Sequence, residues 1–416
     1  MGRIFELETE GAKKFICNSE NGKWVLANYR DQRVDAKIEG NFEKQNYTGT
    51  SLIVINLTRK CNFQCIYCHV RELKGEETDM NPEIGRKIID RTLELEEPYP
   101  PLVFHGSEPL MNFALIKEMV DYSTGKGDFQ FRIQTNGSLL DRDKLEFLVG
   151  NNIRIGISLD GCREHQDKTR PYFNGSSSYS EVSRNLNRLK DRQETVSVIC
   201  VVTKHNVDDL EIIADDYDQR QIGGVLFSPV HPNELEEAVS PDPKIFSANL
   251  KKVLDKKIHA LATGQRYIDI RNLSNYLLTL FNKGATSNCV QCSFGTNHPL
   301  IAVDVDGAIY PCDHFWGRGS YKIGNILENS LEESLNSPRN FRVSRDINCI
   351  EPCSMCNWKR FCGGGCLGGA ERLHKTVESR DSYCTFRREI FEYSVRKLSF
   401  LHGNNLISRI LSRFKD

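Results

Sequence analysis

Six apolar segments alternate with helical ones in the first half of the chain, and this alternation constrains the fold more than any other feature. The six are short, rich in β-branched residues and typical of buried strands. They are Leu52–Leu57, Leu102–His105, Phe129–Thr135, Ile153–Leu159, Val196–Thr203 and Gly224–Val230. Between them, apolar residues recur at helical spacing, as in Leu115–Tyr122 and Val182–Leu189. Because repeated strand–helix units connect by right-handed crossovers, the pattern predicts a curved or barrel-like parallel sheet with catalytic residues at the carboxyl ends of its strands.

Length and charge narrow the class of protein. With 416 residues, 39% of them hydrophobic, the chain can bury at least one large core. The chain has 55 Lys and Arg residues and 56 Asp and Glu residues, which gives a formal net charge of -1. No broad cationic field is therefore available to hold a nucleic acid. No run approaches the roughly 18 apolar residues of a membrane helix, and the first residues lack the apolar core of a signal peptide. We expect a cytoplasmic globular protein without nucleic-acid or membrane partners.

Further segments flank the predicted sheet region, which spans residues 51–235. Residues 1–50 alternate polar and apolar side chains and predict a β-rich extension. Residues 236–288 predict a helical bridge, and residues 387–416 predict an amphipathic C-terminal helix. Cysteines and glycines dominate residues 289–386, which predicts a separate small domain folded around metal rather than around an apolar core.

Three of the fifteen cysteines follow the first predicted strand. Cys61, Cys65 and Cys68 form a CxxxCxxC loop, which can hold three irons of a cubane but is too short to supply a fourth ligand. The amine and carboxylate of a ligand such as S-adenosylmethionine (SAM) could chelate the open iron. The alternative is a zinc site completed by His69 or a distant residue. Because the chain carries no recognisable export signal, we expect reduced thiols that bind metal rather than disulfides.

This loop, at the end of the first strand of a six-unit sheet, resembles the radical SAM superfamily. The resemblance implies an α/β fold, a partial (β/α)6 TIM-like barrel, with a SAM-binding [4Fe–4S] cluster. At the end of the second strand, Gly106-Ser107-Glu108-Pro109 resembles the family's Gly-Gly-Glu-Pro motif, which binds the SAM amino group through its backbone and Glu. Ser107 replaces the second glycine, and Ser tolerates positive φ poorly.

The same resemblance implies further cofactor contacts. Gln134 and Ser158 stand in strand-end segments that line the SAM ribose and carboxylate, and Tyr67 lies within the cluster loop. Val202 corresponds to a β-branched residue that packs on the adenine. Arg170 could pair with the SAM carboxylate, because a guanidinium fork matches that group, although a solvated arginine is the alternative.

The second half carries the most specific cysteine pattern. Cys292 is followed by fourteen residues, Gly307, four residues and Cys312. The pattern continues as Cys353-x2-Cys356-x5-Cys362-x3-Cys366 and, later, Cys384. It resembles the SPASM domain, the auxiliary-cluster domain of radical SAM peptide and protein maturases. A zinc ribbon is the alternative for the first CxxC pair.

The SPASM resemblance implies two auxiliary clusters and therefore three [4Fe–4S] clusters in all. Cys292, Cys312 and Cys366 are expected to hold the first, with Cys289 as the candidate fourth ligand and Cys349 as a rival by proximity in sequence. The ligands expected for the second are Cys353, Cys356, Cys362 and Cys384. The remaining cysteines are expected to be small buried or surface residues rather than ligands: Cys17, Cys162 and Cys200.

Asp313 directly follows Cys312 and is the candidate general base. In the resembling sulfatase maturases, the aspartate at this position takes the substrate proton; a turn cap or ligand-orienting role is the alternative. The expected chemistry begins with reductive SAM cleavage to a 5'-deoxyadenosyl radical, which abstracts a substrate hydrogen. A donor such as flavodoxin or ferredoxin is expected to supply the electron.

The expected substrate is a precursor peptide or protein. SPASM proteins mostly crosslink ribosomally made peptides through carbon–carbon or thioether bonds, or convert a Cys or Ser of a sulfatase to formylglycine. The N-terminal extension favours peptide crosslinking, because sulfatase maturases tend to begin almost at the cysteine loop. Formylglycine formation is the second hypothesis, and a non-catalytic iron–sulfur electron-transfer or zinc-binding module is the third.

Overall fold

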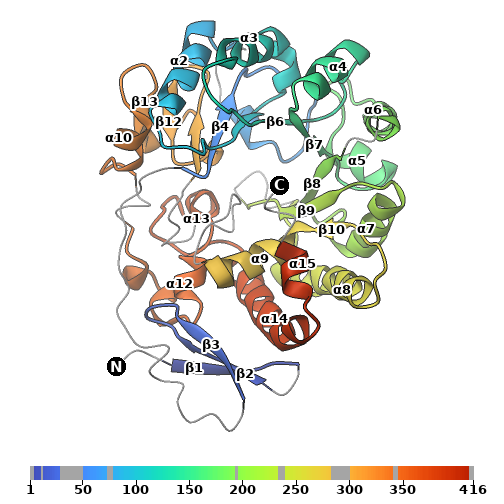
Figure 1. The fold of residues 1–416 in the computed structure, drawn as a ribbon, viewed down its shortest axis with the longest axis vertical. Helices are drawn as coiled ribbons and strands as arrows, with labels where there is room; N and C mark the ends of the chain where they lie inside the picture. Colours follow the sequence, from blue (N-terminus) through green and yellow to red (C-terminus); the bar gives the residue numbers. More distant parts are fainter. Residues whose placement is uncertain are drawn as a thin grey trace.

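The computed structural model describes residues 4–10, 13–28, 50–72, 78–192, 195–232, 239–282, 300–340 and 345–411. Within these residues, the largest sheet has ten strands in the order β10-β9-β8-β7-β6-β5-β4-β11-β12-β13. Helices of the first half, such as α2 (Pro82–Leu93), cover the outer side of this curved sheet, and α13 (Leu367–His374) lies on its inner side (Figure 1). The fold is α/β, as the sequence predicts.

The six predicted strands form the middle of the sheet and pair in parallel in chain order. They are β4 (Leu52–Asn56), β5 (Leu102–His105), β6 (Phe131–Thr135), β7 (Arg154–Ser158), β8 (Ser197–Val202) and β9 (Gly224–Pro229). The other helices between them are α3 (Phe113–Ser123), α4 (Arg142–Gly150), α5 (Arg163–Thr169), α6 (Tyr179–Asp191) and α7 (Leu210–Gln219). This alternation confirms the predicted partial (β/α)6 barrel.

Side chains alternate between the two faces of each central strand. In β8, Val198 and Val202 are fully buried in the hydrophobic cluster that includes helix residues such as Ile213. Ile199 and Val201 point to the other, half-buried face. Because neighbouring strands pair in register, the half-buried residues line one inner face of the barrel, which opens towards the second half of the chain.

The cysteine-rich segment shares its sheet and part of its apolar core with the barrel. Its first strand, β11 (Leu300–Val303), pairs in parallel with β4, and β12 (Ala308–Tyr310) and β13 (Gly324–Asn325) extend the same sheet. Ile301 and Tyr383 belong to the same buried cluster as the barrel strands. The apolar residues of the segment thus complete the core beside β4. At the opposite edge, β10 (Asp269–Ile270) pairs with β9.

The N-terminal extension contains a three-stranded antiparallel sheet, β1 (Ile4–Glu8), β2 (Lys13–Asn18) and β3 (Trp24–Asn28). It packs on later parts of the chain through aromatic rings. The Phe5 ring lies 5.4 Å from that of Trp358, and Trp24 Nε1 donates to the Leu280 carbonyl at 2.8 Å. Residues 29–49 lie outside the described part of the chain.

Helices make up most of the remaining chain. They are α8 (Pro243–Ala262), α9 (Arg271–Asn282), α10 (Leu331–Leu335), α12 (Lys359–Cys362), α14 (Cys384–Gly403) and α15 (Leu406–Leu411). The predicted C-terminal helix therefore divides into two, with Asn405 between them at a φ of +54°. No helix in the described ranges is long and apolar enough to cross a bilayer.

Candidate active site

The loop that carries the first three cysteines lies at the carboxyl end of β4 and is tied to the residues that end α5. Gln64 N donates to the Pro171 carbonyl at 2.7 Å, and Ile66 N donates to the Thr169 carbonyl at 3.0 Å. These bonds fix the loop against a neighbouring strand–helix unit. A loop of this length could not be held so firmly by its own backbone.

The three thiols of this loop lie close together. The pKa of the Cys61 thiol is raised to about 12, mainly by burial and in part by negative charge on Glu108 and Cys68. Burial also raises the pKa of Cys65, which Arg170 opposes and which Cys68 and Cys61 increase. Three such thiols can all be thiolates only where bound cations compensate their charge. The donor set therefore fits a metal cluster.

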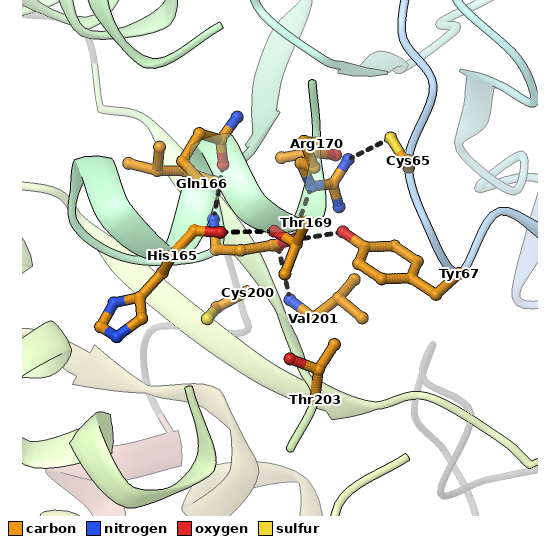
Figure 2. Close-up of polar contacts among 12 residues, drawn as sticks. Cys65, Tyr67, His165, Gln166, Thr169, Arg170, Cys200, Val201 and Thr203 are labelled. Carbon is orange, nitrogen blue, oxygen red and sulfur yellow. Dashed lines mark hydrogen bonds and ion pairs between the residues drawn. The ribbon is translucent and has the colours of Figure 1, made fainter. Parts of the chain in front are cut away.

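Asp160, at the carboxyl end of β7, joins the cysteine loop to the barrel. Its fully buried carboxylate accepts from Thr169 Oγ1 at 2.8 Å and from the Val201 N–H at 3.0 Å, and it also accepts from the Tyr67 hydroxyl. Figure 2 shows Tyr67 and Cys65 on the loop, facing Thr169 and Arg170 at the end of α5. Sequence reasoning did not assign Asp160 a role, although it lies two residues after Ser158.

Arg170 is held inside this network. Only 7% of the residue is exposed, its Nε lies 3.0 Å from Asp160 Oδ2, and its Nη1 lies 4.0 Å from Cys65 Sγ. The alternative of a solvated arginine is therefore wrong. Because its guanidinium is engaged by Asp160 and the loop, we propose that it stabilises the sulfur ligands rather than the SAM carboxylate.

The loop after β5 depends on Gly106. This residue has a φ of +108°, and a Cβ there would lie 2.0 Å from Asn56 Oδ1. Ser107 does not have a positive φ, so the serine that replaces the family's second glycine causes no strain of that kind. The substitution is thus compatible with the loop conformation.

Glu108 accepts hydrogen bonds from three donors of its own chain. Its side chain is fully buried, Oε1 accepts from Thr135 Oγ1 at 2.7 Å and from Leu110 N at 3.1 Å, and Oε2 accepts from Asn136 N at 2.8 Å. Burial raises the pKa of this carboxyl to about 7, against the effect of these donors. The carboxylate thus joins the ends of β5 and β6, and we propose that it positions the loop rather than contacts the SAM amino group.

Gln134 and Ser158 lie together on the inner face, where Gln134 Nε2 donates to Ser158 Oγ at 3.0 Å. Val202 does not join them, because it is fully buried on the opposite face of β8. Val201 lies on the inner face instead. Because side chains alternate between the two faces with a period of two, we propose Val201 rather than Val202 as the residue that packs on the adenine.

Four cysteines of the second half lie in one group. Burial is the main cause that raises the pKa of three of these thiols, Cys353, Cys362 and Cys384. Negative charge on other cysteines of the group contributes as well, and Cys356 contributes in all three cases. The group matches the expected second auxiliary set. Cys349 is exposed to solvent, with its Sγ 3.7 Å from Asp346 Oδ2.

The first auxiliary set is described in part. Cys366, the N-cap of α13, has its Sγ within 4.8 Å of ring nitrogens of His231 and His314. Cys312 is 3% exposed, two residues before His314, and so lies in the same region. The other two expected ligands lie outside the described residues: Cys289 and Cys292.

A cavity of about 650 Å³ lies beside Asp313. Its wall includes His69, which follows the first cysteine loop, and His314 and Arg372 from the second half. The rings of His69 and His314 stack at 4.7 Å along this wall. Other lining residues are Arg59, Asp306, Tyr310, Trp316, Arg318 and Lys322.

The charge of Asp313 is set by these neighbours. Burial alone would raise its pKa, but the imidazoles of His314, His105 and His69 together hold the pKa of the carboxyl below its usual value. Burial lowers the pKa of His314 to about 4. A carboxylate that is ionised and faces a cavity can accept a proton from a bound molecule.

Two family models match the chain. The radical SAM superfamily matches residues 55–217, and the SPASM iron–sulfur cluster-binding domain matches residues 292–357. The chain belongs to the radical SAM superfamily. The first match contains the loop of three cysteines, and the second contains Cys312, Cys353 and Cys356. This radical SAM enzyme therefore has the SAM-binding and iron–sulfur domains that the sequence predicted.

Relatives and solved structures support the same assignment. The cysteine-type anaerobic sulfatase-maturating enzyme of Clostridium novyi is 27% identical, over 84% of this chain and 96% of the relative. The structure of native anSMEcpe with bound AdoMet aligns with a TM-score of 0.72 at 24% identity, over 85% of this chain and 99% of that chain. Streptococcus suis SuiB bound to the precursor peptide SuiA aligns with a TM-score of 0.56 at 14% identity, over 92% of this chain and 98% of that chain. The two structural matches support the fold alone.

The radical SAM site contains residues that sequence reasoning missed. Asp160 and Val201 lie at the carboxyl ends of β7 and β8, and His314 and Arg372 line the cavity. Asp160 follows a strand and precedes a glycine, a signal that could have marked it. No periodic signal marks Arg372, because its place at the cavity depends on how α13 packs inside the barrel.

Proposed function

We propose that this radical SAM/SPASM enzyme is a maturase that oxidises a Cys or Ser of a peptide or protein to formylglycine. The observation that carries the proposal is the ionised Asp313, which lines a cavity beside the SAM-cluster loop. A base at this position can take the thiol or hydroxyl proton of a bound residue while hydrogen is abstracted from its Cβ.

Three [4Fe–4S] clusters are part of this proposal. Cys61, Cys65 and Cys68 would hold the SAM cluster; Cys312 and Cys366, with Cys292 and Cys289, would hold the first auxiliary cluster. The second auxiliary cluster would be held by Cys353, Cys356, Cys362 and Cys384. When bound, SAM and the clusters supply the hydrogen-abstracting radical and accept the electron released from the substrate.

The protein residues would orient the substrate and control the proton. Gln134, Ser158 and Val201 would face SAM at the inner ends of the strands. Asp313 would receive the proton, and His69 and His314 would line the cavity beside its carboxylate. A flavodoxin or ferredoxin remains the proposed electron donor.

Formylglycine formation is favoured over peptide crosslinking for two reasons. The curated relatives with high coverage include cysteine-type sulfatase-maturating enzymes. The N-terminal extension, which had favoured crosslinking, has a structural explanation: Phe5 packs on Trp358, and Lys359 Nζ pairs with Glu20 at 2.7 Å. An extension that packs on its own chain gives no separate support for a peptide-recognition domain.

The test is to incubate the anaerobically reconstituted enzyme with SAM, dithionite and two synthetic peptides from a sulfatase active site, one with Cys and one with Ser at the modified position. We expect an aldehyde on one of them, detected by mass spectrometry and by hydrazide capture. The matched control is the same peptide with Ala there. SAM cleavage without aldehyde, together with an intramolecular crosslink in the Cys peptide, would favour the crosslinking hypothesis instead.

A further inference from the structure

Cys162, His165 and Asp209 form a linear arrangement outside the SAM site. Cys162 Sγ lies 3.2 Å from His165 Nδ1, and His165 Nε2 lies 3.0 Å from Asp209 Oδ2. In this order, the thiol can act as a nucleophile and the imidazole as the base that activates it. The carboxylate can orient the imidazole. Sequence reasoning assigned Cys162 no chemistry.

Two elements build this arrangement. Cys162 is the N-cap of α5, His165 lies one turn later on the same helix, and Asp209 ends a short 3-10 helix, Val207–Asp209. Gly161, with a φ of +122°, makes room for the ring, since a Cβ there would lie 2.7 Å from His165 Nδ1. The approach of the imidazole to the thiol therefore depends on a glycine at this position.

The contacts select one tautomer of His165. Asp209, as a carboxylate, can only accept, so His165 Nε2 carries the proton and Nδ1 is left to accept from the Cys162 thiol. The His165 ring is 11% exposed, Asp209 is 43% exposed, and Cys162 is partly exposed. Figure 2 shows the His165 ring pointing away from Tyr67 and Cys65, so the arrangement is separate from the cluster loop.

Cys349 provides a comparison within the same chain, because its thiol lies beside a carboxylate rather than beside an imidazole. Cys349 is exposed, but Asp346 Oδ2 lies 3.7 Å from its Sγ, and the negative charge of Asp346, with partial desolvation, raises the pKa of this thiol. Exposure alone would make Cys349 the more reactive of the two. A neighbouring base would make Cys162 the more reactive.

We propose that Cys162 is a covalent modification site that undergoes thiol–disulfide exchange with low-molecular-weight disulfides. His165 Nδ1 takes the proton of the Cys162 thiol, and the thiolate sulfur attacks one sulfur of the disulfide. A new S–S bond forms as the old one breaks, and the departing thiolate takes the proton from His165. Asp209 stabilises the intermediate imidazolium. The disulfide is the oxidant: it is reduced to one free thiol as Cys162 is oxidised to a mixed disulfide with the other half.

The test compares two thiols within one protein. The cluster-loaded enzyme is exposed anaerobically to limiting glutathione disulfide and, in parallel, to limiting iodoacetamide, and each cysteine peptide is quantified over time by mass spectrometry. We expect Cys162 to react faster than the more exposed Cys349 with both reagents. His165→Gln should lower the reaction rate of Cys162 by about tenfold or more, because the base is lost.

Asp209→Asn is the matched variant, since this exposed side chain can change without disturbing the core. It should slow Cys162 by a smaller factor and leave Cys349 unaffected. The proposal is overturned if Cys162 reacts no faster than Cys349 in the native chain. It is equally overturned if both variants, with normal iron content, leave the Cys162 rate unchanged.

Discussion

At the residue scale, Asp313 owes its charge to its neighbours. A buried carboxyl normally becomes harder to ionise, and the three imidazoles around Asp313 reverse that tendency. Asp160 and Glu108 are also buried, but chain donors occupy their oxygens. Of these three carboxylates, Asp313 is the one that lines the described cavity.

Replacing Asp313 with Asn should separate SAM cleavage from product formation. The amide keeps the size of the side chain but cannot take a proton, so product should fall by about 10²–10⁴-fold while deoxyadenosine still forms. Both products are measured in one reaction by mass spectrometry. Iron content is the control for an intact first auxiliary cluster. Equal product yield from variant and wild type would assign Asp313 a structural role.

At the element scale, β8 presents neighbouring valines to different surroundings. Val202 is fully buried among core residues. Val201 lies on the inner face, as do Gln134 of β6 and Ser158 of β7. The strand therefore separates stability from cofactor contact by one residue. The two valines form a matched pair of the same size and chemistry.

Val202→Ala should lower the free energy of unfolding by about 2 kcal/mol, because it removes buried methyl groups. Val201→Ala should change stability less and weaken SAM binding. Denaturant titration and equilibrium SAM binding measure the two effects on the same preparations. If SAM affinity falls with Val202→Ala and not with Val201→Ala, the inner face has been assigned incorrectly.

At the scale of the whole molecule, one sheet crosses the boundary between the two family domains. β11 of the second half covers the edge of β4, and the buried residues of both halves form one cluster. A sheet edge left open exposes unpaired backbone groups and apolar side chains. The two halves are therefore expected to fold together.

A fragment of residues 51–288 should accordingly fail to fold as a stable monomer. Without β11, the edge of β4 and the core beside it would be open to solvent. We expect aggregation in size-exclusion chromatography and a weak near-ultraviolet circular dichroism signal, with the full chain as the control. A monomeric fragment with a cooperative unfolding transition would contradict this view.

The number of clusters is also a property of the whole chain. Three [4Fe–4S] clusters predict about twelve irons per chain after anaerobic reconstitution. Changing Cys61, Cys65 and Cys68 together to Ala should leave about eight irons and abolish deoxyadenosine formation. Cys349→Ser, at an exposed thiol, is the control and should keep the iron content of the wild type. Loss of about four irons in this control would make Cys349 a ligand.

The sequence by itself determined the elements and the chemistry that lies close in the chain. Strand and helix periods located the six barrel units, because those periods are local properties of the backbone. Spacing identified the CxxxCxxC loop and the later cysteine pattern, since the ligands of a cluster can come from a short segment. Asp313 followed from its place after Cys312.

Only the tertiary structure decided which distant groups meet. The engagement of Arg170 by Asp160, the burial of Glu108, and the inward face of Val201 depend on how strands and loops pack, which no local period encodes. The Cys162–His165–Asp209 arrangement likewise joins α5 to the 3-10 helix Val207–Asp209, two elements that α6 and β8 separate in the chain. The physical reason is that contacts between elements are fixed by packing and register, and a shift of one residue changes the partners of every side chain on a strand.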